Sequence, residues 1–303
     1  MDRKYFIKIA GLGLAGFSTD SFGLNVFKKK ITERLTILHT NDWHSRIEPF
    51  PNDGSRNSDL GGASRRAGII EDIRKSEKNV LLVDAGDIFQ GTPYFNYFGG
   101  ELEFKLMSEM GYDVATMGNH DFDGGMDGFE KAMKNANFDF VTSNYDFTGT
   151  VLENKTSKYK IIEKSGIRIG IISANIELKG LVPQKLYKNT KYYDPIESSN
   201  KYANLLKKEY NCCYVICLSH LGYKYKDDKV SDVVLATETE NIDLIIGGHT
   251  HTFMNKPDMV KNKLGNDVIV TQAGWGGLML GRLDVEFDAQ KKAFWSRSEF
   301  INS

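Results

Sequence analysis

The chain contains a series of short apolar runs, and most of them end in polar residues whose side chains can bind a metal or move a proton. The runs have the length and the β-branched content of β-strands. They lie at 35–42, 79–87, 112–121, 138–144, 167–175, 214–220, 242–251, 267–274 and 281–287. We therefore expect β-sheets to form the core of this protein.

Helix-like segments separate several of these strands. Apolar residues at helical spacing run from Ala63 to Ile70, and a second helical pattern covers 195–209. Strands that alternate with helices predict an α/β fold, and the uneven spacing of the later runs predicts mixed sheets. The cysteines of 212–217 are expected to be buried strand residues. The segment 48–59, rich in Asn, Pro, Ser and Gly, is expected to be a flexible loop.

Polar side chains cluster just beyond the ends of five of the predicted strands, and five of the six histidines are among them. In α/β sheets, ligands bind where the strands reach their carboxyl ends. We therefore expect these residues to meet in one site. They are Asp42, His44, Asp84, Asp87, Asn119, His120, Asp121, Asp123, His220, His249 and His251.

The residue types in this set indicate divalent metal ions. Imidazole nitrogens together with carboxylate and amide oxygens suit Zn, Mn or Fe, and the absence of Cys from the set argues against a structural zinc finger. The spacings Asp42-x-His44 and His249-x-His251 place both side chains of each pair on one side of an extended segment. So many ligands indicate two ions, which would polarise a phosphoryl oxygen and supply a hydroxide at neutral pH.

The order of these residues resembles the signature of the calcineurin-like metallophosphoesterases. The matching blocks are ILHTNDWH, VDAGD, GNHDFD, His220, GGHTH and QAG followed by GRLD, over about residues 35–287. The residues within these blocks are similar to those of the 5'-nucleotidase branch of that family. The resemblance implies a four-layer α/β/β/α sandwich of two mixed sheets flanked by helices, the metallophosphatase fold, with a dinuclear metal centre at one edge.

The same resemblance implies how the ligands are divided between two ions, with Asp87 bridging both. For the first ion the implied ligands are Asp42, His44, Asp87 and His251. For the second ion they are Asn119, His220 and His249. Because Asn119 is neutral, the centre stays positive enough to attract a phosphate.

The resemblance makes His120 the catalytic group, with Asp123 holding it in position. His120 would stabilise charge on the phosphoryl group or protonate the leaving oxygen. Asp121 is expected to support the turn. His39 lies inside the first run and is expected to pack in the core or to hydrogen-bond a ligand rather than bind metal. Asp84, at the end of the second run, is expected to support a ligand or the end of the strand.

Other candidate side chains receive structural interpretations. Arg46 is expected to be a solvated loop residue, although it could touch a phosphate, and Arg65 and Arg66 are expected to be exposed or ion-paired. Trp43 lies between two ligands and suits either the core or a pocket wall. Trp275, in the tight Gly-rich loop AGWGG, is expected to be a wall or lid of the site.

The resemblance implies a metal-dependent phosphoric ester hydrolase. The favoured activity is that of a 5'-nucleotidase-type phosphomonoesterase, in which a metal-bound hydroxide attacks a nucleotide or another phosphate ester in line. A 2',3'-cyclic nucleotide phosphodiesterase and a non-catalytic metal-binding subunit of a two-chain assembly remain alternatives. A nucleic-acid partner is not expected, because 39 Lys+Arg balance 40 Asp+Glu and no basic stripe interleaved with aromatic residues is visible.

The first residues are typical of an export signal. Arg3 and Lys4 lead into an apolar, Gly-rich stretch at 7–17 that is too short to span a bilayer. The order Arg-Lys-x-Phe-Ile-Lys resembles a twin-arginine signal, with Lys4 in the place of the second Arg. We predict a signal-like segment and linker over 1–30, a catalytic domain over 31–303, and an exported, periplasmic protein. Retention as a membrane anchor is the alternative.

The length of 303 residues carries a further expectation. Full-length 5'-nucleotidases have a C-terminal domain that supplies arginines for the phosphate and two aromatic rings that stack on the base, and this chain is expected to lack it. A separate chain would then complete the nucleoside pocket. The alternative is an enzyme with little selectivity for the base.

Overall fold

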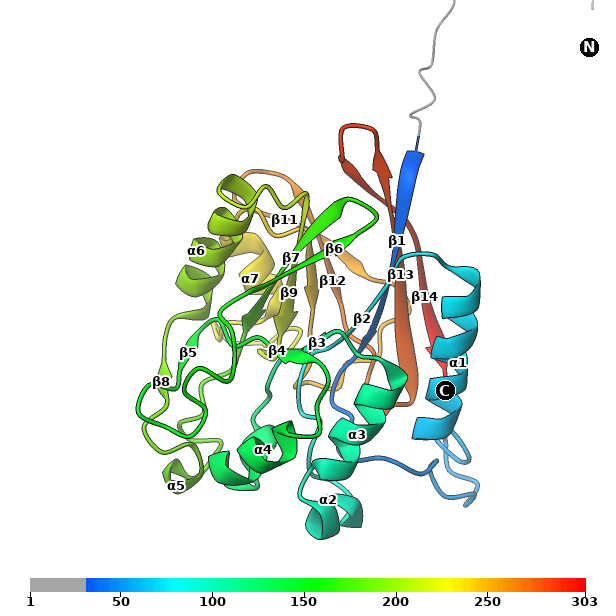
Figure 1. The fold of residues 1–303 in the computed structure, drawn as a ribbon, viewed down its shortest axis with the longest axis vertical. Helices are drawn as coiled ribbons and strands as arrows, with labels where there is room; N and C mark the ends of the chain where they lie inside the picture. The colour runs from blue at the N-terminus through cyan, green and yellow to red at the C-terminus, as the bar shows by residue number, and fades with distance from the viewer. Residues whose placement is uncertain (1–30) are drawn as a thin grey trace, which may run out of the picture. The chain divides into compact units, whose positions relative to one another are not determined.

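In the computed structural model, which describes residues 31–303, two six-stranded sheets lie face to face (Figure 1). The first has the strand order β14-β13-β1-β2-β3-β4, with β1 Ile31–Thr40, β2 Val80–Asp84, β3 Val114–Ala115, β4 Asp139–Phe140, β13 Met279–Asp288 and β14 Ala293–Asn302. The second has the order β11-β12-β10-β9-β7-β6, with β6 Lys160–Lys164, β7 Ile167–Ala174, β9 Tyr214–Ser219, β10 Leu244–Ile246, β11 Asp258–Lys261 and β12 Asp267–Thr271. A separate small pair joins β5 Tyr145–Asp146 to β8 Lys191–Tyr192.

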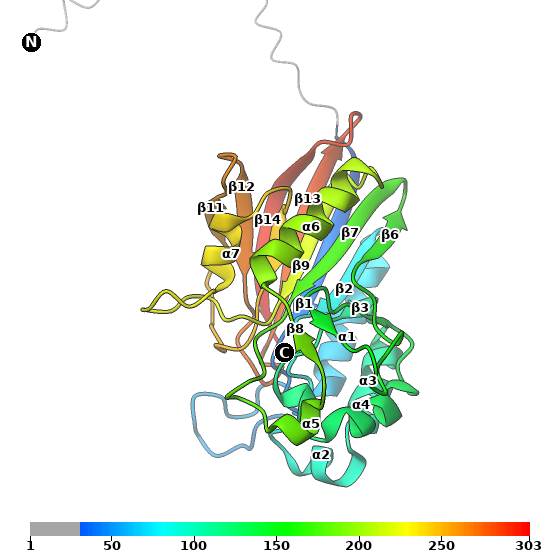
Figure 2. The same cartoon turned by 90° about the vertical axis from the view of Figure 1, so that its left-hand side faces the viewer.

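Helices cover the outer face of each sheet (Figure 2). Over the first sheet and its lower edge lie α1 Ala63–Ser76, α2 Pro93–Phe98, α3 Glu101–Met110, the 3-10 helix η1 His120–Phe122 and α4 Gly125–Met133. Following β5 in the chain are α5 Gln184–Tyr187, α6 Pro195–Lys208 and α7 Asp232–Glu238. Of these, α6 and α7 pack on the second sheet.

Alternation of side chains along the strands produces three apolar layers. On β1, Leu35 and Ile37 point into the core between the sheets, whereas Leu38 packs with Phe104 of α3 beneath the helices. Behind the second sheet, Cys217 of β9 joins the core under α6 and α7. The four-layer α/β/β/α arrangement expected from the sequence is confirmed.

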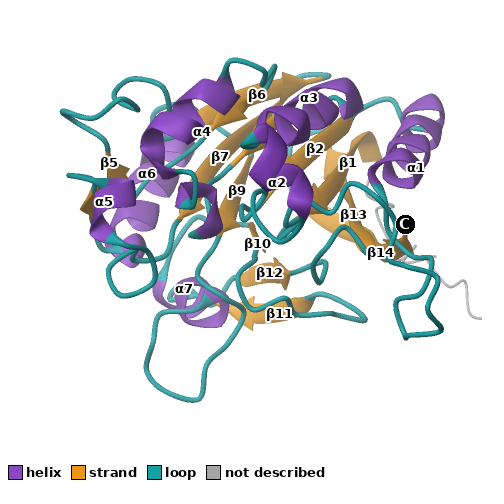
Figure 3. Cartoon of the chain, turned by 90° about the horizontal axis from the view of Figure 1, so that it is seen from below, coloured by secondary structure: helices purple, strands orange, loops and turns teal. Residues whose placement is uncertain are grey.

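Each sheet contains four parallel strands, so their carboxyl ends meet at one edge. β1, β2, β3 and β4 run parallel, and so do β7, β9, β10 and β12. In the first sheet the antiparallel strands β13 and β14 follow β1 on one side, and in the second the antiparallel strands β6 and β11 form the two edges. Both sheets are therefore mixed, as expected. Figure 3 views the molecule from the side where the loops following the parallel strands lie.

All the predicted strands and both predicted helices are present, but several elements were not anticipated. The run at 112–121 forms only the two-residue strand β3, because its second half leaves the sheet to build a loop and η1. β14 was missed because it is a half-exposed edge strand without a continuous apolar run. The segment 48–59 is an irregular loop. Cys217 is a buried strand residue as expected, but Cys212, although buried, and the partly buried Cys213 precede β9 and are not strand residues.

Within residues 31–303, no helix has the length and apolar character needed to cross a membrane. The predicted export signal and linker over 1–30 lie outside the described residues.

Candidate metal centre

The loops after β1 and β10 bring one carboxylate and two imidazoles together. Asp42 and His44 follow β1, and His251 follows β10. One ligand atom of each lies within 4.8 Å of those of the other two. Nε2 of His251 is 3.3 Å from Oδ1 of Asp42 and 3.0 Å from Nε2 of His44. We call these three residues the first ligand group.

A second ligand group consists of Asp87, His220 and His249, from the loops after β2, β9 and β10. Their ligand atoms also lie within 4.8 Å of one another, and Nε2 of His220 is 3.0 Å from Oδ2 of Asp87. Asn119 stands next to this group, since the adjacent His120 donates its backbone N–H to Oδ1 of Asp87. Oδ1 of Asn119 is buried and has no hydrogen-bond partner among the described residues. A buried acceptor without a partner is costly, so this oxygen suits a metal ion.

The two ligand groups form one centre. Oδ1 of Asp42, in the first group, lies 4.0 Å from Nε2 of His220, in the second. The backbone N–H of His249 donates to both carboxylate oxygens of Asp42, each at 3.0 Å. The structure thus brings together all seven residues that the sequence suggested as ligands.

Hydrogen bonds to the backbone orient two of the imidazoles. Nδ1 of His44 lies 3.1 Å from the carbonyl oxygen of Gln90, and Nδ1 of His220 lies 2.7 Å from that of Ala85. Because a carbonyl oxygen only accepts, each Nδ1 is the donor. Nε2, the nitrogen that a metal ion would bind, then faces the centre in both residues, which is the arrangement that metal-binding histidines adopt.

The backbone itself is unusual at this centre. Five of the seven residues have left-handed backbone angles, a conformation that residues other than Gly rarely adopt. The φ values are 50° for Asp42, 54° for His44, 54° for Asp87, 71° for His249 and 51° for His251. Such conformations are unfavourable and concentrate at functional sites, where the surrounding structure holds them.

Burial and charge shift the pKa values of the candidate ligands in different directions. Burial lowers the pKa of His44, and it lowers that of His249 to about 4. Burial alone would raise the pKa of Asp87, but the charges of His220, His44 and His120 hold it well below its ordinary value. Burial opposes protonation of His220 as well, yet the neighbouring Asp87 raises its pKa to about 10. That proton must leave before Nε2 of His220 can bind a metal ion, and the ion would then take over the proton's role beside Asp87.

His120 and Asp123 form a pair at the mouth of the centre. Nδ1 of His120 lies 2.8 Å from Oδ2 of Asp123, and this hydrogen bond raises the pKa of His120. The His120 side chain is 39% exposed, whereas that of His220 is fully buried. The ring centroids of His120 and His44 are 5.3 Å apart. A substrate could therefore touch His120 and both ligand groups at once.

Comparison with known proteins agrees with this geometry. Residues 35–253 match the model of a family described as calcineurin-like phosphoesterase. The chain belongs to the calcineurin-like phosphoesterase family. Members of this family use a dinuclear divalent metal site, and the two ligand groups are the candidates for it.

Relatives of this calcineurin-like phosphoesterase include nucleotide hydrolases. Snake venom 5'-nucleotidase of Gloydius brevicauda is 35% identical over 275 residues, which cover 84% of this chain and 45% of that protein. The trifunctional nucleotide phosphoesterase YfkN of Bacillus subtilis is 30% identical over 286 residues, covering 84% of this chain and 18% of that protein. The solved NAD nucleotidase of Haemophilus influenzae is 29% identical with a TM-score of 0.80, covering 90% of this chain and 56% of that one. The chain spans about half the length of the venom enzyme.

Asp121 supports the turn, as the sequence predicted. Its carboxylate accepts four backbone N–H groups, at 2.9 Å from Asp87, 3.0 Å from Ile88, 3.1 Å from Phe89 and 2.8 Å from Gly118. These bonds tie the loop after β2 to the loop after β3. Asp121 therefore holds Asp87 in place without facing the metal centre.

Replacing Asp121 by Asn should destabilise the protein by roughly 3 kcal/mol, because the amide group turns a donor toward N–H groups that lose their acceptor. Urea unfolding of the metal-free protein would measure this. Asp72→Asn is the matched control, since Asp72 is exposed and pairs only with Lys75, and its effect should stay below about 1 kcal/mol. Equal effects of the two substitutions would contradict the assigned role.

Sequence reasoning did not assign roles to Asn41 and Gln272. Asn41 donates to Oδ2 of Asp42 at 2.6 Å, and its own Oδ1 accepts the N–H of Ala273 at 2.8 Å. Gln272 donates to Asp232 at 2.9 Å and to the carbonyl of Gly248 at 2.8 Å. These amides join the loops that carry the ligands. The sequence did contain a signal for these two residues, because Asn41 stands in the motif block ILHTND and Gln272 in the block QAG.

The predictions for His39 and Asp84 agree with the structure. His39 is fully buried, packs edge-on against Phe300, and burial lowers its pKa to about 3. Asp84 is buried and accepts hydrogen bonds from Thr40 and from the backbone of Gly86. Neither residue belongs to a ligand group. Trp43 is 1% exposed and belongs to the core.

The expectation for Arg66 is wrong. Arg66 is 1% exposed, its guanidinium lies 4.2 Å from the centroid of the Trp43 ring, and Nε and Nη2 have no hydrogen-bond partner among the described residues. It is buried because α1 turns this position toward the first sheet. Arg65 is exposed, as expected. Arg46 is only half-buried, and its guanidinium lies 4.3 Å from the centroid of the Phe50 ring, so it is not simply a solvated loop residue.

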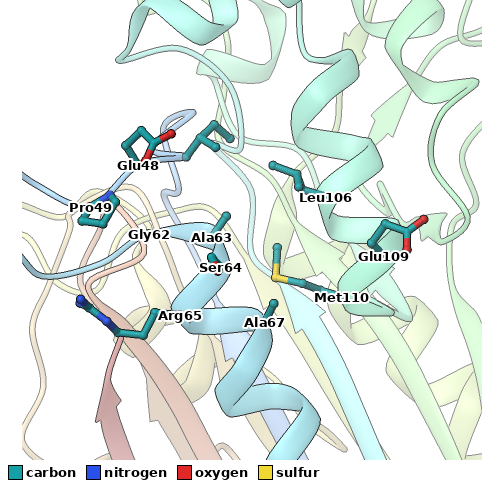
Figure 4. A pocket seen from close by; sticks show the side chains of 11 residues that line it. Glu48, Pro49, Gly62, Ala63, Ser64, Arg65, Ala67, Leu106, Glu109 and Met110 are labelled. Atoms are coloured by element: carbon teal, nitrogen blue, oxygen red, sulfur yellow. The ribbon is translucent and has the colours of Figure 1, made fainter.

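A cavity of about 300 Å³ lies between α1 and α3, and no residue of either ligand group lines it (Figure 4). Its wall comes from α1, with Ala63 and Ala67, from α3, with Leu106 and Met110, and from the loop that contains Glu48. The lining is mostly apolar and offers no convergent ligands for a phosphate. We therefore place the chemistry at the ligand groups and not in this cavity.

Proposed function

We propose that this chain hydrolyses phosphate monoesters as a metal-dependent enzyme of the 5'-nucleotidase type. The observation that carries the proposal is the contiguity of the two ligand groups with the His120–Asp123 pair. Three carboxylate or imidazole ligands in each group suit divalent ions, and a proton donor stands at the edge of the same centre. The nucleotidase names of the relatives support this choice of substrate class.

The proposed ligands follow the two groups. Asp42, His44 and His251 would hold one ion, and Asp87, His220, His249 and Asn119 the other. By distance Asp87 belongs to the second group. A bridging position for Asp87 remains our prediction.

When bound, two divalent ions supply Lewis acidity toward a phosphoryl oxygen and increase the acidity of water, so that displacement at phosphorus proceeds in line. The side chains of the protein position and donate the proton. Asp123 accepts the hydrogen bond from Nδ1 of His120, which leaves Nε2 of His120 pointing outward with the mobile proton. The hydrogen bond to Asp123 raises the pKa of His120 and so favours its protonated form. His120 can therefore donate to the departing oxygen or stabilise charge on the phosphoryl group.

Removal of metal should abolish this activity. Dialysis against a chelator is expected to lower hydrolysis of adenosine 5'-monophosphate to background, and addition of Zn, Mn or Fe should restore it. Two equivalents of metal should bind per chain, measured by elemental analysis after gel filtration. Full activity in the chelated protein would contradict the proposal.

A second candidate activity is hydrolysis of 2',3'-cyclic nucleotides. One relative is named a trifunctional nucleotide phosphoesterase, which is consistent with action on more than one kind of nucleotide ester. One panel separates the candidates: a 5'-monophosphate, a 2',3'-cyclic nucleotide and an aryl phosphate, each assayed with the three metals. Preference for the cyclic diester would replace the monoesterase proposal. Binding of two ions with no turnover of any ester would instead indicate a non-catalytic metal-binding subunit.

We propose further that residues 31–303 are the catalytic domain and that the protein is exported to the periplasm. The venom origin of one relative, stated in its name, is consistent with export. Fractionation of the native host would test the location. A separate chain that completes the nucleoside pocket remains a prediction, which co-purification from the same host would test.

A further inference from the structure

Three glycines shape the loop that carries Trp275. Gly274, Gly276 and Gly277 have φ values of 72°, 63° and 64°, all in the left-handed region. The N–H of Gly276 donates to the carbonyl oxygen of Asp42 at 2.7 Å. The loop is therefore tied to the backbone of a first-group ligand, with Trp275 held beside the metal centre.

The Trp275 ring stacks on the imidazole of His251. The two ring centroids are 5.5 Å apart and the planes differ by 12°. The His251 ring also meets His44 edge-on, with centroids 4.9 Å apart. His251 thus contacts both a first-group ligand and the indole of Trp275.

His251 differs from His44 and His220 in the contacts of its Nδ1 atom. His44 and His220 each donate from Nδ1 to a backbone carbonyl. Among the described residues, Nδ1 of His251 has no hydrogen-bond partner, and its side chain is 38% exposed, against 9% for His44 and 0% for His220. Stacking on Trp275 is the contact that restricts rotation of this ring.

The stack continues away from the centre. Phe50 meets Trp275 edge-on, with centroids 5.5 Å apart and planes at 86°. The guanidinium of Arg46 lies 4.3 Å from the centroid of the Phe50 ring. Trp275 is therefore itself supported from behind by the loop that follows β1.

We propose that Trp275 is a positioning residue that orients His251 for binding of an ion by the first ligand group. The proposal rests on the ligand assignment in the proposed function. An imidazole that binds a divalent ion becomes electron-poor, and the electron-rich face of an indole stabilises it, as in cation–π pairs. Trp275 thus takes the orienting role that backbone carbonyls have for His44 and His220.

The test is a metal titration of the apo protein by calorimetry, with Zn and with Mn as probes. Trp275→Ala should weaken one of the two binding events roughly tenfold and leave the other unchanged. Trp275→Phe retains a ring to stack on His251, so its affinity should stay within about threefold of the wild type. The weakened event should be the one that His251→Ala removes. Trp295→Ala is the matched control, because Trp295 is a 41% exposed residue of β14, and it should bind metal as the wild type does.

Thermal unfolding of the apo variants separates positioning from loss of structure. The proposal is supported if the apo variant melts near the wild-type temperature and binds one of the two ions more weakly. Unchanged affinity for both ions in Trp275→Ala would overturn it, and so would equal weakening of both ions. These results are independent of turnover, since a wild-type chain that binds two ions but hydrolyses no ester would reject the proposed function and leave the role of Trp275 intact.

Discussion

Replacing His120 by Asn is expected to lower kcat by roughly 10²- to 10⁴-fold while both metal ions stay bound. The side chain of His120 contributes no atom to either ligand group. Its backbone N–H, which the substitution retains, is the part that contacts Asp87, at 2.7 Å. What the variant loses is the proton at Nε2, which Asp123 orients through Nδ1.

Steady-state kinetics with a 5'-monophosphate, together with elemental analysis of the purified variant, would measure both effects. Asp123→Asn serves as a graded comparison. It weakens the hydrogen bond that raises the pKa of His120, so its kcat should fall less than that of His120→Asn. An unchanged kcat in His120→Asn would show that another group handles the proton, and loss of metal would mean that His120 acts through the ligands.

Replacing Gly118 by Ala is expected to weaken binding of one metal ion by roughly 100-fold. A Cβ atom at this position would overlap Oδ1 of Asp87 and lie 2.5 Å from Nε2 of His220 and 2.6 Å from the backbone nitrogen of Asp87. Neither neighbour can retreat easily, because Asp87 and His220 are buried and anchored. The added methyl group therefore occupies space within the second ligand group.

Gly128→Ala is the matched control, since a Cβ at Gly128 in α4 meets nothing within 4 Å. That substitution should leave metal affinity unchanged and raise the unfolding free energy by up to about 1 kcal/mol, as Ala favours a helix over Gly. Metal titration and urea unfolding of both variants would compare them. Wild-type affinity for both ions in Gly118→Ala would be incompatible with the proposed second site.

Much of the metal centre was predictable because its residues stand in short, local sequence patterns. Asp42-x-His44 and His249-x-His251 each follow an apolar run, and a strand that ends in such residues places them at a sheet edge. Imidazole and carboxylate side chains also have few other reasons to gather there. The expectation of one common site followed from the strands alone, and the structure confirms that these residues lie together.

The supporting residues were harder to predict because their partners are distant in the chain. Asn41 binds the backbone around Ala273, and their positions differ by 232 residues. Arg66 looks like any helix arginine in the sequence, and only the packing of α1 on the first sheet buries it over Trp43. Such contacts depend on sheet order, which neighbouring residues do not encode.

The sequence by itself determined the α/β class, the strands and the chemical types of the ligands, because alternation, strand ends and side-chain chemistry are properties of short segments. The tertiary structure decided which loops meet. It placed Asp87 with His220 and His249, imposed left-handed backbone on five of the seven proposed ligands, and stacked Trp275 on His251. These features arise from parallel strands of two different sheets that end at one edge, and only the folded chain brings those ends together.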